Sequence, residues 1–320
     1  IVSCILAFII PFELFLFAYG VLGPLHYLTE ISWLHDKNYY STSKKDVILL
    51  LVISLILTII FLLQKHNPQW LFQFIENQDI RKLIGHLTFV AFASALFFAF
   101  IKNPTIKIVG VMVVILLTFI SNYFMVFFTV FLPTLIHVFI FTSLFMLYGA
   151  LKSRSKPGYL AVALHIICPF LLFYLFPTFS ASTSAGKDLY QRSDFVGLNQ
   201  HIFFNYFYTP DNSEITPDKI MGFIYSSKAG IAIMRFIAFA YMYHYLNWFS
   251  KTEIIRWHKV PKSRFIFVVV AWIVSIILYS IDYTLGFQWL FLLSFMHVLL
   301  EFPLNYLSFA GIIKELTGRG

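Results

Sequence analysis

The stretch VILLLVISLILTIIFLL, residues 47–63, decides the fold class. It contains no charged residue, and its apolar side chains run continuously, whereas a membrane β-strand alternates apolar and polar positions. A helix of about 20 apolar residues is long enough to cross a hydrocarbon core about 30 Å thick. Together with its flanks, this stretch predicts a membrane-spanning helix.

The same pattern recurs along the chain. Of the 320 residues, 59% are hydrophobic and only 12% are charged, whereas a soluble domain has roughly 25% charged residues. We therefore expect an all-α, polytopic integral membrane bundle with about nine transmembrane helices. The predicted spans are 1–22, 46–64, 83–101, 108–124, 126–148, 159–178, 229–249, 265–284 and 288–312.

The loops complete the predicted organisation. Residues 1–320 form a single membrane domain in this interpretation, because no polar segment is long enough to bury a core of its own. We expect an outer polar loop at 179–228, and the aromatic centre of that loop, 195–208, is typical of a short interfacial helix or lid. The main basic loop, 250–264, is expected on the cytoplasmic side. The chain begins IVSCILAFII without methionine, so we expect the true N-terminus to be missing and this run to be a span instead of a cleaved signal peptide.

The distribution of Lys and Arg predicts the orientation. If the C-terminus is cytoplasmic, that side carries 15 of the 23 basic residues, which agrees with the positive-inside rule. The net charge of +8 then reflects topology and attraction to anionic lipid head groups. No segment combines basic and aromatic residues as a nucleic-acid-binding surface does, so membrane lipids are the expected partners and nucleic acid is not.

Several ionisable residues lie within or beside the apolar spans. Such residues are costly in a membrane and face a cavity or each other, so each is a functional candidate. Counted inward from the helix ends, the histidines among them could converge in the cytoplasmic half of the bundle. The candidates are Glu13, His26, Glu30, His137, His165, Arg235, His244, His297 and Glu301.

Two pairs share a spacing that places both members on one helix face. His26 and Glu30 in GPLHYLTE (23–30), and His297 and Glu301 in FMHVLLEF (295–302), stand four residues apart. Both side chains of a pair could bind a metal, or the carboxylate could orient the imidazole. An interhelical hydrogen bond is the alternative for either pair.

Two further questions stay open at this stage. Glu13 and Arg235 could form an intramembrane ion pair, or each could line a cavity. His35 and Asp36 could continue the site of His26 or cap the following turn, and capping is the stronger interpretation. The two cysteines, Cys4 and Cys168, lie in apolar spans as small packing residues.

Four short patches, in matching order, resemble the Brp/Blh family of bacterial and archaeal membrane proteins, which includes β-carotene 15,15′-dioxygenases that make retinal. GPLHYLTE is similar to the family's early histidine followed four residues later by an acid. The other three patches are TLIHVFIF (134–141), YMYHYLNWFSK (241–251) and FMHVLLEF. The chain departs from the family where Phe141 replaces the acid after the second histidine and where Trp248 replaces a further histidine of the third patch.

The resemblance implies a mechanism and a site. It implies that His26, His137, His244 and His297 hold Fe(II), with zinc as the alternative metal and His165 as a further ligand that a site lacking one histidine could recruit. Glu30 and Glu301 would orient two of the imidazoles as catalytic residues. The substrate would be lipophilic, a carotenoid in the specific case, and the location a bacterial inner membrane.

Two other classes of function remain open. A transporter or proton-coupled permease would use Glu13, Arg235, His297 and Glu301, and the Gly and Pro residues of GPLH and EFPLN are typical of unwound transport sites. The absence of an inverted internal repeat counts against it. A noncatalytic membrane assembly subunit would instead use its polar groups for helix–helix contacts.

Overall fold

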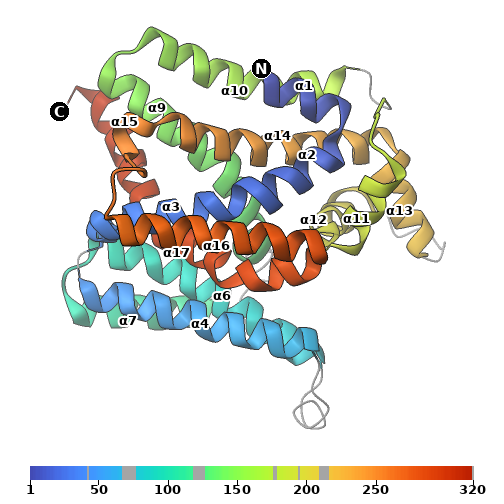
Figure 1. The fold of residues 1–320 in the computed structure, drawn as a ribbon. Helices are drawn as coiled ribbons and strands as arrows, with labels where there is room; N and C mark the ends of the chain where they lie inside the picture. Colours follow the sequence, from blue (N-terminus) through green and yellow to red (C-terminus); the bar gives the residue numbers. More distant parts are fainter. Residues whose placement is uncertain are drawn as a thin grey trace. The chain divides into compact units, whose positions relative to one another are not determined.

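The computed structural model describes residues 1–41, 43–66, 77–117, 127–175, 179–193, 195–208 and 216–318. Throughout these ranges the regular elements are helices and none is a strand, which confirms the predicted all-α class (Figure 1). The chain divides into two compact units. The first comprises Ile1–His26, Ser153–Arg256 and Pro261–Phe287, and the second comprises Tyr27–Lys152, Trp257–Val260 and Gln288–Gly320.

Among the described residues, seven helices are long and apolar enough to cross a membrane. Two shorter apolar helices, Leu83–Ala95 within α6 (Asn77–Phe100) and α7 (Pro104–Leu117), fall in the third and fourth predicted spans. Residues 118–126, where the fourth predicted span ends, lie outside the described ranges. The seven long helices are Pro11–Asp36, Lys44–His66, Thr129–Ser153, Lys156–Tyr174, Lys228–Ser250, Lys262–Ile281 and Tyr283–Thr317.

The first predicted span, 1–22, has the wrong bounds. A short helix, α1 (Val2–Ile9), ends at Ile10, and Pro11 begins a new helix that continues to Asp36. Proline suits the first position of a helix because its missing N–H has no intrahelical partner there. His26 and Glu30, predicted near a helix end, therefore lie well inside the second helix.

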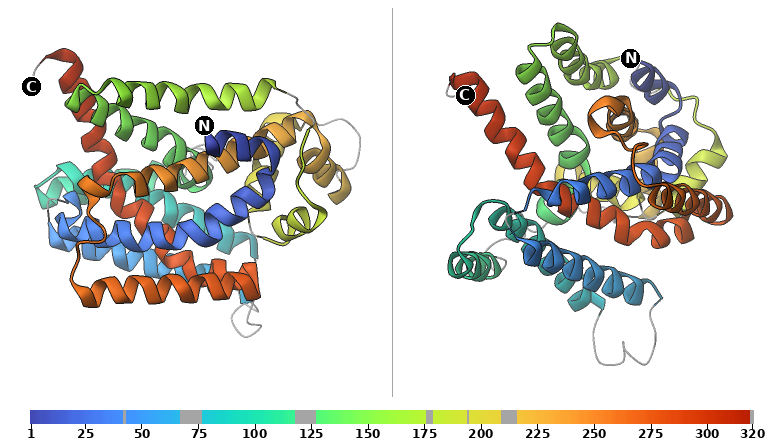
Figure 2. Two further views of the ribbon diagram at one scale, coloured as in Figure 1. Left: turned by 45° about the horizontal axis from the view of Figure 1, so that its top comes forward. Right: turned by 60° about the vertical axis from the view of Figure 1, so that its left-hand side comes forward.

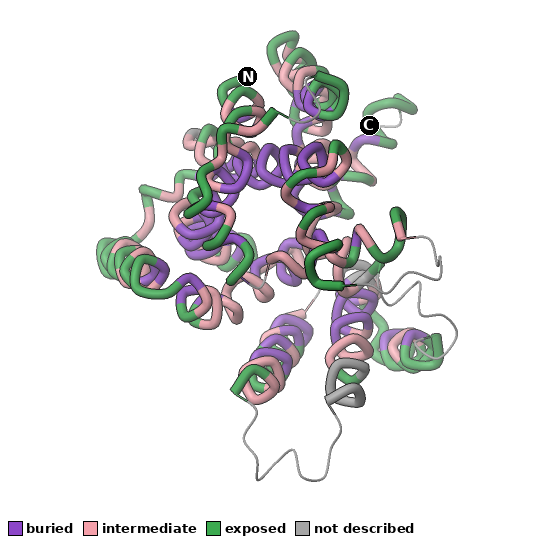
Figure 3. Tube along the Cα trace, turned by 90° about the vertical axis from the view of Figure 1, so that its right-hand side faces the viewer, coloured by how far each residue is buried: buried purple, intermediate pink, exposed green. Residues whose placement is uncertain are grey.

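In the first unit, α14 (Lys228–Ser250) is the central helix. It packs against α1, α2 (Pro11–Phe17), α10 (Lys156–Tyr174) and α13 (Pro217–Ser226) (Figure 1). Its buried face includes small residues such as Ala232, Ala238 and Ala240, which let neighbouring helices approach closely. Gly230 permits the sharp turn from α13, because any Cβ at this position would overlap the Phe223 carbonyl. Figure 3 colours the described residues by burial: buried, intermediate or exposed.

The predicted polar loop 179–228 is largely helical. It contains α11 (Ser184–Arg192), α12 (Val196–Ile202), a short π-helix η4 (Phe203–Phe207) and α13. Tyr190 of α11 is fully buried, packs edge-on against Phe12 and donates a hydrogen bond to Asn199 Oδ1 at 2.5 Å. The segment therefore folds back onto α2 instead of standing apart as a loop.

Arg235 stabilises the C-terminal end of α10. Its side chain is completely buried and donates hydrogen bonds to the carbonyls of Leu172 and Leu175, at 3.4 and 3.0 Å, and to that of Phe179. Its guanidinium also lies 4.1 Å from the ring centroid of Phe8. A cation at a helix C-terminus complements the helix dipole, and these bonds satisfy carbonyls that have no partner inside the helix.

In the second unit, α6 packs against both α4 (Lys44–His66) and α7 (Figure 2). Phe89 and Ala93 of α6 form a small core with Val114 of α7. Near the N-termini of α4 and α7, Asp46 and Lys107 form a buried ion pair. Burying two charges is costly unless they are paired, so this contact links the two helix ends.

Candidate metal centre

The first pair of converging histidines joins two helices of the first unit. His26 lies near the start of α3 (Gly23–Asp36), and His244 lies toward the end of α14. Their Nε2 atoms are 3.0 Å apart, and both side chains are buried, with 1% and 7% exposure. The two nitrogens are within hydrogen-bond distance of each other, and an ion bound to both at about 2.1 Å would hold them about 3.0 Å apart at a right angle and about 3.4 Å apart at the tetrahedral angle, so only a small shift would admit a shared metal.

The second pair belongs to the second unit. His137 lies in the π-helical segment η3 (Phe127–Phe141), which contains Pro133, and His297 lies in the long helix α17 (Tyr283–Thr317). The two rings meet edge to face with centroids 5.1 Å apart, and both are buried, with 1% and 3% exposure. A proline inside a helix removes one backbone bond, and π-helical turns are frequent at functional sites.

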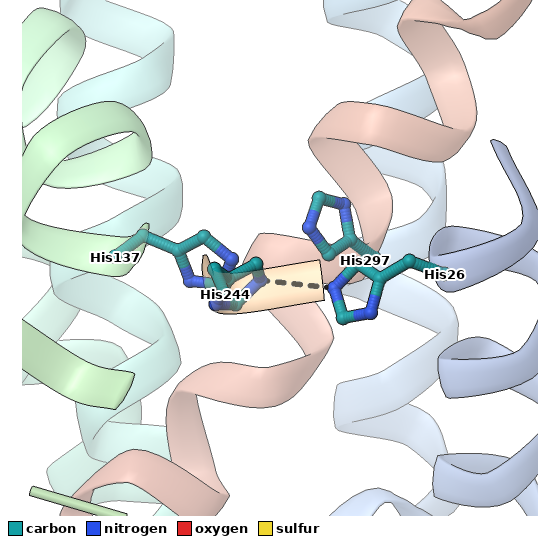
Figure 4. Close-up of side chains that lie close together, drawn as sticks. All are labelled: His26, His137, His244 and His297. Atoms are coloured by element: carbon teal, nitrogen blue, oxygen red, sulfur yellow. Dashed lines mark hydrogen bonds between the residues drawn. The ribbon is translucent and has the colours of Figure 1, made fainter. Parts of the chain in front are cut away.

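One imidazole nitrogen from each of these four histidines lies within 4.8 Å of the corresponding nitrogen of every other one (Figure 4). Four separate helices contribute the rings, which come from distant parts of the sequence. Buried neutral imidazoles are ligands that Fe, Zn, Cu and Ni all accept. The group of His26, His137, His244 and His297 could therefore hold a metal ion.

The carboxylate beside the four histidines is that of Glu301, and it contacts a histidine of another helix. For Glu301, the sequence left open a shared metal with His297, orientation of that imidazole, or an interhelical contact; its Oε2 lies 3.1 Å from Nδ1 of His137 on another helix, as in the last of these. Nδ1 of His297 faces the Leu293 carbonyl of its own helix at 3.3 Å. When Nδ1 donates to an oxygen, Nε2 keeps the lone pair that a metal needs. Glu301 thus supplies His137 with the acid that Phe141 does not provide.

Aromatic rings surround the four imidazoles. Tyr27 stacks on His297 with centroids 4.1 Å apart, and Trp248 meets His26 edge-on at 5.2 Å. Tyr245 lies 5.1 Å from His26. Trp248 therefore lies against His26 as an apolar wall of the four-histidine group. Sequence reasoning did not identify Tyr27 or Tyr245, although both stand next to a predicted ligand.

His165 lies outside the four-histidine group. It is buried in α10, where its ring stacks on Tyr243 at 4.5 Å and lies 5.6 Å from Phe239. Glu30 is also buried, one turn beyond His26 on α3. Its predicted role in orienting His26 stays a prediction.

The remaining polar candidates have other partners. The Glu13 carboxylate accepts hydrogen bonds from the backbone N–H and the hydroxyl of Thr183, at 2.6 and 2.9 Å, at the N-terminus of α11. Arg235 binds the carbonyls at the end of α10, as described above. His35 and Asp36 contact each other at 3.3 Å on the exposed surface.

Comparison of the chain with protein-family models, with curated proteins and with solved structures found no significant match.

Proposed function

We propose that this protein is an integral membrane metalloenzyme, a non-haem iron oxygenase that acts on a lipophilic substrate. The observation that carries the proposal is the group of four buried histidines whose ligand nitrogens lie within 4.8 Å of one another. A buried polar group costs free energy unless it is hydrogen-bonded or bound to an ion, and the approach of four ligand nitrogens to one another is the arrangement that a shared metal ion requires.

The donor set fits the proposed metal. All four candidate ligands are imidazoles, which in their neutral form suit Fe(II) as well as Zn(II), and a carboxylate beside His137 would stabilise its orientation and raise its basicity. When bound with open coordination positions, Fe(II) can bind and activate dioxygen. Zinc is the alternative ion.

The chain's own residues would bind the substrate and exclude water. Tyr27, Trp248 and Tyr245 present aromatic surface around the imidazoles, and Phe141 lies 6.5 Å from His137. Such surfaces suit an extended apolar molecule, and the resemblance to retinal-forming dioxygenases makes a carotenoid the specific substrate that we propose. The Lys and Arg distribution supports a cytoplasmic C-terminus, and the same resemblance supports a bacterial inner membrane.

The contacts of two charged residues favour the enzyme over a permease. The alternative transport pathway would use Glu13 and Arg235, but Glu13 binds Thr183 at a helix start, and Arg235 binds two carbonyls at the end of α10 and that of Phe179 beyond it. Both contacts are those of helix capping, which holds residues in place instead of exposing them to a moving ion.

Elemental analysis of the detergent-purified protein tests the proposal. We expect about one iron per chain in the wild type and loss of the metal in a variant carrying His26→Ala and His297→Ala. His165→Ala is the matched control, because His165 is equally buried but lies outside the four-histidine group, and it should retain the metal. Absence of metal even after reconstitution with Fe(II) or Zn(II) would contradict the proposal.

The substrate is tested separately on the iron-loaded protein. Addition of β-carotene and dioxygen should yield an aldehyde product, retinal, and the variant lacking His26 and His297 should yield none. If the protein binds iron but leaves carotenoids intact, the metal centre stands and the carotenoid assignment fails.

A further inference from the structure

The helix that carries His26 widens just before it. Between α2 and α3, the segment η1 (Ala18–Leu22) is π-helical, and the Gly23 N–H bonds to the carbonyl five residues earlier, that of Ala18. Pro24 follows directly. Because proline has no N–H and its ring clashes with the carbonyl four residues before it, an ordinary α-turn is disfavoured at this point. The sequence YGVLGP (19–24) therefore explains the wide turn.

Two side chains from other helices bind the carbonyls that flank this turn. Trp272, in α16 (Lys262–Ile281), donates its indole N–H to the Val21 carbonyl at 2.8 Å. Tyr283, the first residue of α17, donates its hydroxyl to the Leu16 carbonyl at 3.2 Å. One acceptor carbonyl, that of Leu16, thus lies before the π-segment, and the other, that of Val21, lies near its end. Both contacts are within the first unit.

The register of the turn decides where His26 points. Each α-helical residue rotates the chain by about 100°, so converting the wide turn into an ordinary one would change the face of the helix on which His26 lies relative to α2. His26 follows the π-segment by one turn, and its Nε2 lies 3.0 Å from that of His244 on α14. That short distance depends on the π-helical register.

We propose that Trp272 and Tyr283 are positioning residues that hold the η1 turn in its π-helical register and so fix His26 toward His244. For its consequence in metal binding, the inference rests on the proposed function. Neither residue touches the imidazoles in the described contacts; each acts through a backbone carbonyl of the helix that carries His26.

The chain offers close controls for both residues. Tyr279 is buried next to Tyr283, with ring centroids 4.7 Å apart, but its hydroxyl has no hydrogen-bond partner among the described residues. Tyr283→Phe and Tyr279→Phe therefore remove the same atom from neighbouring rings, and only the first breaks a bond to the turn. Trp289 is half exposed, so Trp289→Phe is the control for Trp272→Phe.

The position of His26 can be measured without any metal. In a background carrying Cys4→Ser and Cys168→Ser, the changes His26→Cys and His244→Cys introduce two thiols. Because the Cys side chain is shorter than that of His, these thiols lie farther apart than the imidazole nitrogens they replace, so a bifunctional thiol reagent such as a short bismaleimide is used to join them. We expect efficient cross-linking in this parent, a marked loss of yield on adding Tyr283→Phe or Trp272→Phe, and no change on adding Tyr279→Phe or Trp289→Phe. An unchanged yield with both test variants, or no cross-link in the parent, overturns the inference.

Metal binding then separates this inference from the proposed function. With all native histidines present, Tyr283→Phe and Trp272→Phe should lower Co(II) affinity about 10-fold or more and alter the visible Co(II) spectrum, which reports ligand geometry. The two control variants should match the wild type. If the wild type binds no metal while the cross-link responds as expected, the proposed function fails and the positioning role stands.

Discussion

Nδ1 of His137 lies 3.1 Å from Oε2 of Glu301, so the second histidine motif receives from α17 the acid that its own helix lacks. A carboxylate that accepts a hydrogen bond from a proton-bearing Nδ1 orients the ring and leaves Nε2 with the lone pair that a metal requires. We expect Glu301→Ala to lower metal affinity about 10–100-fold, as loss of an orienting partner does elsewhere. Glu301→Gln should lower it less, because an amide oxygen still accepts a hydrogen bond.

Competition with a metal-binding dye would measure this effect. Glu315→Gln is the control, since Glu315 lies on the same helix but is exposed. Equal affinities for the wild type and Glu301→Ala would show that the carboxylate does not orient the ligand.

Replacement of Arg235 should destabilise the first unit. Arg235→Met would leave carbonyls at the end of α10 without their charged donor and remove the contact with Phe8, at a cost of about 3 kcal/mol or more. Arg235→Lys should recover only part, because an ammonium group lacks the planar fork that reaches several carbonyls. Thermal unfolding in detergent measures both. Arg192→Met, at an exposed position, should change the midpoint little; a similarly small change for Arg235→Met would refute the capping role.

The Asp46–Lys107 pair should show strong coupling. Asp46→Asn leaves the Lys107 ammonium buried without its counter-charge, which costs about 3–5 kcal/mol. The double variant Asp46→Leu with Lys107→Met removes both charges and should recover most of the lost stability. A double-mutant cycle built from the single variants Asp46→Leu and Lys107→Met and their double variant tests this on the unfolding free energy. Simple additivity of the two single changes would mean that the pair contributes no interaction energy.

Glu13 should stabilise the first turn of α11. Glu13→Ala removes the acceptor for the Thr183 N–H and hydroxyl, so the first turn of α11 should exchange its amide hydrogens faster. Hydrogen exchange read by mass spectrometry over 183–192 provides the measurement. Asp188→Asn in the middle of α11 is the control and should leave the exchange unchanged. Protection that persists without Glu13 would show that the packing of Tyr190 suffices.

Much of the helical layout could be predicted, because an apolar run of sufficient length has few alternatives in a membrane. The four histidines were among the candidates, since an ionisable group in such a run must face another polar group, but this argument included His165 equally, and the choice of the four came from the family resemblance. The residue that Glu301 contacts could not be predicted. Spacing places Glu301 on the same face as His297, but it does not reveal which side chain an opposing helix brings to that face, and here it is His137.

The break at Pro11 was missed for a related reason. Residues 1–22 read as one apolar run, and hydropathy does not register a change of helix inside such a run. Proline is favoured at the first position of a helix, so Pro11 indicated that a new helix begins there. The length of the apolar run led to a single predicted span instead.

The ring of Tyr279 packs between two residues without side chains. A Cβ on Gly20 would lie 3.5 Å from Cγ of Tyr279, in ordinary contact, whereas a Cβ on Gly286 would overlap the ring. The Tyr279 ring therefore fills the space that a side chain at position 286 would need. A side chain gained at 286 demands a smaller one at 279, so Gly286→Ala should be harmful alone and tolerated beside Tyr279→Ala, and the two sites should vary together in any selection for a folded protein.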